Sequence, residues 1–380
     1  MALNHACLPV PAPAQVHRYY NQLCTHVKQI DFTQREKMRI ALDAMGSDNC
    51  PEPEIRAAVE AVNLFGDEIT LIGPEDILRP RLQELSRDGV PVHIVHTTDT
   101  ISMEDKDRKL ARKAKRNPMT TMAVGMDLLK DGEVDAFVTA GNTGGALATA
   151  YFRLGTIPGI KRPALTGLFP VKGGYCAVLD IGANPDCKPE FLLQFAVMGS
   201  VYVNNVLNIP QPRVGLISNG EEAGKGNELV RDTYSLLKSS GLNFIGNLEG
   251  KELFGGDADV AVTDGFTGNV LLKSSEAVAQ LITGTLRQEL NSSIRTKLGA
   301  LLAKPAFTSI KKLLDPGEIG AVPLLGIDGL VFIGHGRSDS YAIVSAIRSA
   351  RQAVESNLLE ALSTAVQERL ETLQSRIQDD

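Results

Sequence analysis

The chain has 380 residues, a formal net charge of −6 and 43% hydrophobic residues, the ordinary balance of a globular protein. This length allows one large α/β domain or two smaller ones. The acidic balance argues against a nucleic-acid-binding protein, and no apolar run approaches the roughly 20 residues of a membrane-spanning helix. The five cysteines form no CxxC pair, so we expect no disulfide, no cysteine-ligated zinc and a reducing cytoplasmic location.

Residues 1–37 differ in character from the rest of the chain. They hold three prolines and two of the five cysteines, show no apolar period and lack the pattern of a secretory signal. Met38 directly precedes the first predicted strand. We therefore expect an extension at 1–37 that catalysis does not need, a two-lobed catalytic domain at 38–350 and a C-terminal helix at 351–380.

From Arg39 onward, short apolar β runs alternate with helical patterns, which predicts a largely parallel sheet covered by helices. The predicted strands are 39–43, 69–72, 92–95, 136–139, 176–180, 214–218, 260–263 and 331–333. The predicted helices are 54–65, 76–86, 120–130, 145–154, 190–205, 227–239 and 269–290, followed by one long helix from about Ser340 past Arg369.

The loops after five of these strands carry small and amide-bearing residues. Glycine lets a backbone approach a ligand closely, and a helix that starts just after such a loop points free N–H groups at an anion. Ligands of open parallel sheets sit outside the carboxyl ends of the strands. One such loop can be a simple turn, but five together indicate an anion site. The loops are 43–48, 141–145, 180–184, 219–222 and 264–269.

The common nucleotide motifs are absent. Segment 220–226 has three residues between its first glycine and Gly224-Lys225, one too few for a P-loop, and segment 334–339 lacks the third glycine of a dinucleotide fingerprint. No HExxH or GxSxG motif is present. Direct attack of phosphate on an acyl thioester needs no protein nucleophile, only anion binding, oxyanion stabilisation and alignment. A thiolate leaving group, whose thiol has a pKa of about 8.5, also needs no strong acid.

Segments 42–48 (LDAMGSD), 140–147 (AGNTGGAL) and 179–187 (LDIGANPDC) resemble the bacterial phosphate acyltransferases of phospholipid synthesis. Segments 194–199 and 264–270 and the turn 334–336 extend the resemblance from about residue 39 to 350. The resemblance implies transfer of a fatty acyl group from acyl carrier protein to inorganic phosphate. It also implies a homodimer. We expect no metal and no bound cofactor. The implied fold is a three-layer α/β/α fold similar to phosphotransacetylases and to isocitrate/isopropylmalate dehydrogenases.

Two places depart from the family pattern and put local loop geometry in question. Ser47 stands where a second glycine is expected, and Arg116-Asn117-Pro118-Met119 stands where a serine-rich stretch is usual. Cys187 lies near the expected site, but no histidine or other base is close to it in sequence, so we do not expect it to be a nucleophile.

The candidate site residues come from these loops and from the turn near 335. We expect catalytic roles, as oxyanion donors or general acid, for Asn269, Asn142, Asn184 and His335. We expect binding of phosphate or substrate by Asp264, Gly265, Thr267, Gly268, Gly141, Thr143, Gly144, Lys188, Asn219 and Lys225. For each residue the alternative is a structural role in a turn or a solvated side chain.

Two basic segments stand out on this acidic chain. Segment 106–116 has seven basic residues, and with the acids at 104, 105 and 107 it carries a local charge of about +4, which suits capture of the acidic carrier protein by Lys113 and Arg116. A solvated helix face is the alternative. Segment 286–314 places leucines and isoleucines at helical spacing among lysines and arginines, which predicts packing against a dimer partner or contact with an anionic membrane. Membrane contact would suit hand-over of the product to a membrane acyltransferase.

Three other functions remain open. A phosphotransacetylase acting on short acyl-CoA is the nearest alternative. A metal-dependent β-decarboxylating dehydrogenase would need clustered carboxylate ligands and a nucleotide site, and the sequence shows neither pattern. A membrane scaffold without enzymatic activity would show no phosphate-dependent turnover.

Overall fold

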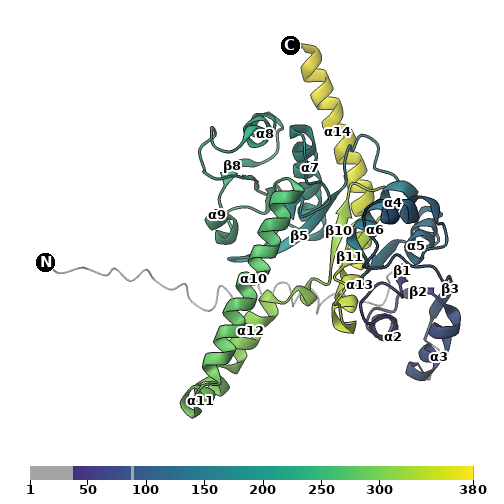
Figure 1. The fold of residues 1–380 in the computed structure, drawn as a ribbon. Helices are drawn as coiled ribbons and strands as arrows, with labels where there is room; N and C mark the ends of the chain where they lie inside the picture. Colours follow the sequence, from purple (N-terminus) through teal and green to yellow (C-terminus); the bar gives the residue numbers. More distant parts are fainter. Residues whose placement is uncertain (1–36, 87–89, 380) are drawn as a thin grey trace.

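The computed structural model describes residues 37–86 and 90–379, which form one eleven-stranded sheet covered by helices (Figure 1). The sheet order is β3-β2-β1-β4-β11-β10-β5-β6-β9-β7-β8. The strands are β1 Arg39–Asp43, β2 Glu68–Gly73, β3 Val92–His96, β4 Ala136–Thr139, β5 Ala164–Val171, β6 Gly174–Leu179, β7 Val214–Ile217, β8 Phe244–Leu248, β9 Val260–Val262, β10 Ala321–Leu325 and β11 Val331–Gly334.

The helices cover both faces of this sheet. They are α2 Glu52–Phe65, α3 Glu75–Leu85, α4 Asp107–Arg116, α5 Thr121–Lys130, α6 Thr143–Arg153, α7 Pro189–Val206, α8 Glu228–Ser239, α9 Gly250–Gly255, α10 Gly265–Leu290, α11 Ile294–Leu302, α12 Lys304–Leu314, α13 Ser340–Glu355 and α14 Leu358–Asp379. Helices α10, α11 and α12 leave the body of the molecule as an arm (Figure 1). This layering confirms the expected three-layer α/β/α fold.

The sheet consists of two parallel blocks that run in opposite directions. Strands β3, β2, β1, β4 and β11 are parallel to one another, and so are β6, β9, β7 and β8. Between the blocks, β10 and β5 pair antiparallel with each other and with their outer neighbours β11 and β6. The first block with its helices forms one lobe, and the second block forms the other.

Two apolar layers hold the lobes together, one on each face of the sheet. Along β1, Ile40 and Leu42 belong to one layer and Ala41 to the other, as the alternation of side chains along a strand requires. The first layer includes α2, α7 and α13, and the second includes α5 and α6. Each of these helices buries residues at helical spacing, such as Ile343 and Ile347 of α13.

The structure differs from the sequence prediction at several elements, and the short helix α9 was not predicted. The expected single helix after Ser340 is broken, because Asn357 adopts a left-handed conformation (φ 50°) that ends α13 before α14 begins. Strands β5, β8 and β10 were not predicted. Strands β5 and β10 each contain a proline, Pro170 and Pro323, and β5 also contains Gly167. The expected extension at 1–37 lies outside the described residues, apart from residue 37.

Candidate active site

The loop after β6 is built around a buried carboxylate. Asp180 is fully buried and accepts hydrogen bonds from the backbone amides of Leu165 (3.2 Å), Gly182 (3.0 Å), Ala183 (3.0 Å) and Asn184 (2.6 Å). The side-chain amide of Asn184 donates a further bond at 2.9 Å. Burial raises the pKa of Asp180, while these donors oppose that rise because they favour the carboxylate. Asp180 thus fixes the loop, although the sequence analysis did not propose it as a site residue.

Asp264 caps the N-terminus of α10, in the loop after β9. Its Oδ1 accepts a hydrogen bond from the Thr267 amide and its Oδ2 accepts one from the Thr267 hydroxyl, each at 2.8 Å. A carboxylate at this end of a helix is favoured by the helix dipole. The two residues, both predicted to bind substrate, therefore bind each other.

Two glycines bring the loops after β6 and β9 into contact. The Gly265 amide donates to the Asn184 carbonyl at 2.8 Å. At Gly268, a Cβ atom would lie 1.9 Å from the carbonyl oxygen of Asp180, so only glycine fits this approach of two backbones. Gly265 and Gly268, predicted to bind phosphate, are packing residues in this structure.

The two asparagines of these loops differ in whether their side-chain amides are free to bind a ligand. Asn184 is buried, and its side-chain amide nitrogen donates to the Pro163 carbonyl (2.7 Å) as well as to Asp180. It stabilises the loop, and the catalytic role expected for it stays a prediction. Asn269 is exposed, and none of the hydrogen bonds of the described residues involves its side chain. It lies beside Gly182, where a Cβ would be 3.9 Å from Asn269 Cβ. Its amide is free to meet a substrate.

Asn142 caps α6 in the first lobe. Its Oδ1 accepts from the Gly145 amide at 2.9 Å, and its Nδ2 donates to the carbonyls of Ser102 (3.1 Å) and Asp105 (3.2 Å). The side chain thus ties the start of α6 to the loop before α4. In this structure the amide hydrogens of Asn142 are engaged within the protein, and its catalytic role stays a prediction.

The first residues of α6 remain open. Thr143 and Gly144 are exposed at the helix start, and within the described ranges no acceptor is recorded for their amides. The Gly141 amide, in contrast, donates to the Thr139 hydroxyl at 3.0 Å. Unpaired N–H groups at a helix N-terminus attract anions. Thr143 and Gly144 therefore keep the binding capacity predicted for them, whereas Gly141 has a structural role.

A second buried carboxylate organises this lobe. Asp43 Oδ2 accepts from the Thr139 hydroxyl at 2.8 Å and its Oδ1 accepts from the Met45 amide at 3.1 Å, while burial raises its pKa. Further along the same loop, the Asp48 amide donates to the Gly336 carbonyl at 2.7 Å. The loops after β1, β4 and β11 are thereby joined into one surface.

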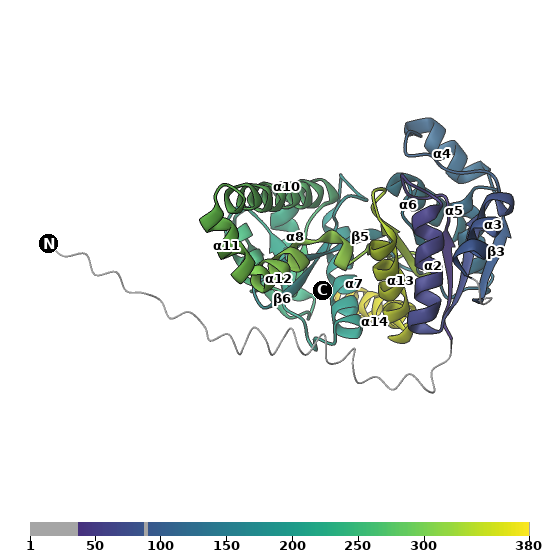
Figure 2. The ribbon, with the colours of Figure 1, turned by 90° about the horizontal axis from the view of Figure 1, so that it is seen from below.

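His335 lies in the turn after β11, within range of charges on α10. Burial lowers its pKa, so it is neutral at neutral pH, and the charges that act on it are Glu276, Lys273 and Arg337. Glu276 and Lys273 form an ion pair of 3.0 Å on α10, which starts at the loop after β9. The turn after β11 thus faces the second lobe. Figure 2 shows α4, α6 and α10 along the same side of the molecule.

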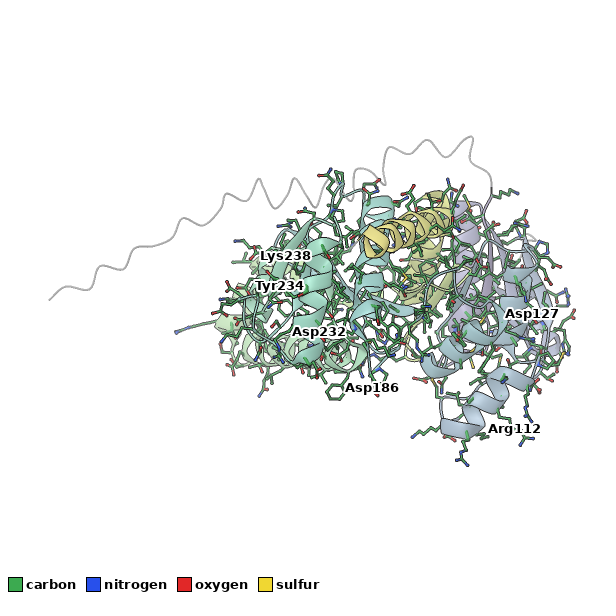
Figure 3. The ribbon with its side chains drawn as sticks, turned by 90° about the horizontal axis from the view of Figure 1, so that it is seen from above. Arg112, Asp127, Asp186, Asp232, Tyr234 and Lys238 are labelled. Atoms are coloured by element: carbon green, nitrogen blue, oxygen red, sulfur yellow. The ribbon has the colours of Figure 1, made fainter. Side chains whose placement is uncertain are left out.

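The predicted lysines and Asn219 lie at the rim. Lys188 is exposed where α7 begins, and Asn219 and Lys225 are exposed in the loop after β7, the neighbour of β9 in the sheet. The stem of Lys225 covers Gly220, where a Cβ would lie 2.7 Å from Lys225 Cγ. Asp186, in the loop of Lys188, lies on the same side of the molecule as α4 (Figure 3).

A group of three carboxylates near this rim already has a cation. Glu221, Glu249 and Glu252 bring carboxylate oxygens within 4.8 Å of one another. The ammonium of Lys251 pairs with all three, at 2.7, 3.7 and 3.2 Å. The group is therefore an ion-pair network rather than a binding site.

Cys187 is unsuited to nucleophilic attack. Its sulfur lies 3.4 Å from the Asn184 carbonyl oxygen, to which the thiol can donate, and burial raises its pKa to about 12. A thiolate is the reactive form of cysteine, and at neutral pH this thiol stays protonated. This agrees with the sequence analysis.

The basic residues of α4 fall into two groups, lysines that contact other residues of the protein and arginines that are exposed. Lys113 is only 31% exposed, and its ammonium bonds to Asp105 (2.7 Å) and to the Thr100 carbonyl (2.8 Å). Lys109 pairs with the same carboxylate at 2.6 Å, and together the two lysines hold the pKa of Asp105 well below its usual range. Lys115 lies 5.3 Å from the centre of the Phe152 ring. These lysines serve the fold.

The remaining cations of α4 face outward. Arg108, Arg112 and Arg116 are exposed and four residues apart, which places them on one side of the helix. No ion pair is recorded for them among the described residues. Figure 3 shows Arg112 on the outer side of α4, away from the body of the molecule. We call Arg108, Arg112 and Arg116 the arginine row.

The chain is similar in sequence to known proteins. The profile of a family described as "Fatty acid synthesis protein" matches residues 38–361. A protein named phosphate acyltransferase from Acidobacterium capsulatum is 46% identical over 314 residues, which cover 82% of this chain and 92% of that protein. The protein of the same name from Koribacter versatilis is 47% identical over 334 residues, with coverages of 86% and 92%.

Solved structures share the fold at much lower identity. A phosphotransacetylase from Streptococcus pyogenes superposes with a TM-score of 0.59 at 17% identity, covering 89% of this chain and 99% of that chain. A phosphotransacetylase from Staphylococcus aureus gives a TM-score of 0.55 at 15% identity, with coverages of 90% and 98%. At these identities the likeness confirms the expected fold.

Proposed function

The chain belongs to the phosphate acyltransferase family of fatty acid synthesis proteins, and from this premise we propose that it transfers a fatty acyl group from acyl carrier protein to inorganic phosphate. An oxygen of the phosphate dianion attacks the thioester carbonyl carbon, the carbon–sulfur bond breaks, and the carrier leaves as a thiolate that takes up a proton. The products are acyl phosphate, a precursor for phospholipid synthesis, and free carrier protein.

The phosphate site in this proposal is the start of α6. The observation that carries it is the open first turn of that helix, with Thr143 and Gly144 exposed and capped by the neutral Asn142. The start of α10 is less suited, because Asp264 already places a carboxylate there. A phosphate dianion next to that carboxylate would be repelled.

The thioester carbonyl would lie at Asn269, whose amide is free to donate to the developing oxyanion. The neutral His335 faces α10 and would orient phosphate between the lobes. No residue has to form a covalent intermediate, which agrees with the protonated state of Cys187. The protein then acts by binding and aligning the two reactants.

The direct test is turnover with matched donors. Purified protein is given phosphate with either a long-chain acyl carrier protein or acetyl-CoA, and acyl phosphate is measured as its hydroxamate. We expect acyl phosphate from the carrier-bound donor and little from acetyl-CoA. A preference for acetyl-CoA would make the protein a phosphotransacetylase, and no phosphate-dependent product with either donor would reject both activities.

We propose that the arginine row captures the acidic carrier protein. Arg116 was expected to contact it from the sequence, and the exposed Arg108 and Arg112 extend the same side of α4. Lys113, the other residue expected there, is held by Asp105 and contributes less. The backbone carbonyl of Asp105 also accepts a hydrogen bond from the side chain of Asn142. The loop before α4 is therefore bonded directly to the residue that caps α6.

This docking is tested with charge reversals. Arg112→Glu with Arg116→Glu should raise KM for the carrier-bound donor about tenfold at low salt and weaken its salt dependence, because exposed charges are screened within about 8 Å at physiological salt. The matched control is Lys130→Glu with Arg56→Glu, on other surfaces. Turnover of a small acyl-CoA should stay near that of the unaltered protein. Equal losses on both donors would contradict docking.

We propose that the arm formed by α10–α12 mediates dimerisation and peripheral membrane contact. Its apolar residues are unusually exposed: Leu281 by 68%, Ile294 by 79%, Leu301 by 67% and Leu302 by 85%. Basic residues accompany those near the tip. None of the described helices is long and apolar enough to span a bilayer. In the proposal, α10 packs against a second copy, the tip touches the anionic membrane surface, and the enzyme is otherwise cytoplasmic.

The two roles of the arm are separable. Leu281→Asp should shift the protein from dimer to monomer in sedimentation analysis, with unchanged vesicle binding per chain. Leu301→Asp with Leu302→Asp should reduce binding to anionic vesicles without changing the mass in solution. If both variants remain unaffected in both assays, the arm has neither role.

A further inference from the structure

Two polar side chains lie buried beneath the loop after β1. Ser47 is 5% exposed and Glu54, at the start of α2, is completely buried. The Ser47 amide donates to Glu54 Oε1 at 3.0 Å. The Ser47 hydroxyl lies beside the same carboxyl and favours its ionised form. Among the described residues, neither this hydroxyl nor Glu54 Oε2 has a hydrogen-bond partner.

The surroundings of Glu54 are acidic or neutral. Asp43 adds a like charge, and burial raises the pKa of Cys50 to about 11, so its thiol remains uncharged. Burial in these surroundings raises the pKa of Glu54 to about 7. Protonation of Glu54 therefore contributes to the stability of the fold. This contribution is complete below the ordinary pKa of about 4.3 and is lost as the pH rises through about 7.

The loop that Glu54 holds supports the proposed phosphate site. At Gly46, a Cβ would lie 2.9 Å from the Gly141 amide nitrogen, so the two loop backbones touch directly in front of α6. One residue beyond Ser47, the amide of Asp48 bonds to the Gly336 carbonyl in the turn of His335. A shift of Ser47 would move both neighbouring loops.

A buried carboxyl that lowers stability at neutral pH needs another reason to be present, since an apolar side chain would avoid that cost. We propose that Ser47 and Glu54 form a positioning pair, in which Glu54 accepts the Ser47 amide and so holds the β1 loop against the start of α6 in the geometry that binds phosphate. The inference rests on the proposed function for its ligand.

The test separates the hydrogen bond from the charge. Glu54→Gln keeps an acceptor oxygen for the Ser47 amide and removes the charge, whereas Glu54→Leu removes both. The dissociation constant of inorganic phosphate is measured by calorimetry at pH 8, together with the KM values for phosphate and for the acyl carrier protein. Glu60→Leu, on the exposed side of the same helix, is the matched control.

We expect Glu54→Leu to weaken phosphate binding roughly tenfold, the loss typical of one hydrogen bond to a charged group. Its KM for the carrier-bound donor should not change. Glu54→Gln should bind phosphate within about twofold of the unaltered protein, and its melting temperature should exceed that of the unaltered protein increasingly as the pH rises from 6 to 8.5. If the leucine variant fails to fold, the more adaptable Glu54→Met takes its place.

Three results would overturn the inference. Unchanged phosphate binding in the apolar variant would leave Glu54 with a purely structural role. An equal loss in Glu54→Gln would assign the effect to charge rather than to positioning. If the unaltered protein binds no phosphate, the pair has no ligand whose site it could position. Phosphate binding without acyl phosphate formation, in contrast, would reject the proposed function while still testing the positioning pair.

Discussion

The starts of α6 and α10 look alike in sequence but differ in structure. Each follows a strand, and each has glycines in its first turn. At α10, the capping residue is the carboxylate Asp264, and the amides of Gly265 and Thr267 are engaged. At α6, the cap is the neutral Asn142, and the amides of Thr143 and Gly144 are open.

This difference teaches that a glycine-rich helix start is not by itself an anion site. At α10 the glycines allow two backbones to touch, and the helix dipole is already matched by a carboxylate. At α6 the dipole has no such partner. We therefore propose that phosphate binds at α6 and that the thioester carbonyl lies at Asn269 of α10. The predictions below test this division.

The largest effect on stability is expected from a matched pair of glycine variants. Gly268→Ala should lower the free energy of unfolding by about 3 kcal/mol, because the new Cβ would collide with the backbone of Asp180. Gly144→Ala should change it by less than about 0.5 kcal/mol, since its nearest neighbour is the movable end of Leu110 at 3.2 Å. Urea denaturation measures both. Equal costs would mean that the two helix starts are packed alike.

The second pair compares the asparagines. Asn269→Ala should lower kcat by about 10²–10³ with an unchanged melting temperature, because it removes an exposed donor to the oxyanion. Asn142→Ala should cost about 1 kcal/mol of stability through loss of the helix cap. Steady-state kinetics and thermal denaturation are measured on both. Near-normal turnover of Asn269→Ala would remove this residue from the site.

A smaller effect is expected when α6 is made to resemble α10. Thr143→Asp adds a carboxylate to the open helix start and should raise KM for phosphate about tenfold, while KM for the carrier-bound donor stays constant. Thr143→Ser serves as the control and should change neither constant. An unaltered phosphate KM in the aspartate variant would place the anion elsewhere.

The smallest effect concerns the extension. A protein that begins at Met38 should keep its turnover and melt within a few degrees of the full chain, because residues 1–37 have no counterpart in the resemblance and fall outside the family match. Calorimetry and activity assays measure this. A larger loss of melting temperature would make the extension part of the fold.

The sequence predicted the strands that carry the site, since uninterrupted apolar runs such as that of β4 form a clear pattern. It missed β5 and β10, because prolines interrupt their patterns, and with them the reversal between the lobes. It identified the loops of Asn269 and Thr143. It could not separate open amides from engaged ones, because the bonds of Asn142 and Asn184 reach residues about 20 to 40 positions away.

The buried carboxylates show the same limit. Asp180 directly follows the apolar strand β6 and Asp43 ends the apolar strand β1, which was a usable signal for a structural hydrogen-bond acceptor. Glu54 gave no such signal, because a glutamate in the first turn of a helix is usually exposed and favoured there by the dipole. Only packing against the β1 loop reveals its burial.

A crystal structure with bound inorganic phosphate tests the central claim most directly. We expect phosphate oxygens within hydrogen-bonding distance, about 3 Å, of the Thr143 and Gly144 amides, with His335 facing the ligand. Phosphate bound at the start of α10, beside Thr267 and in place of its contact with Asp264, would contradict the account.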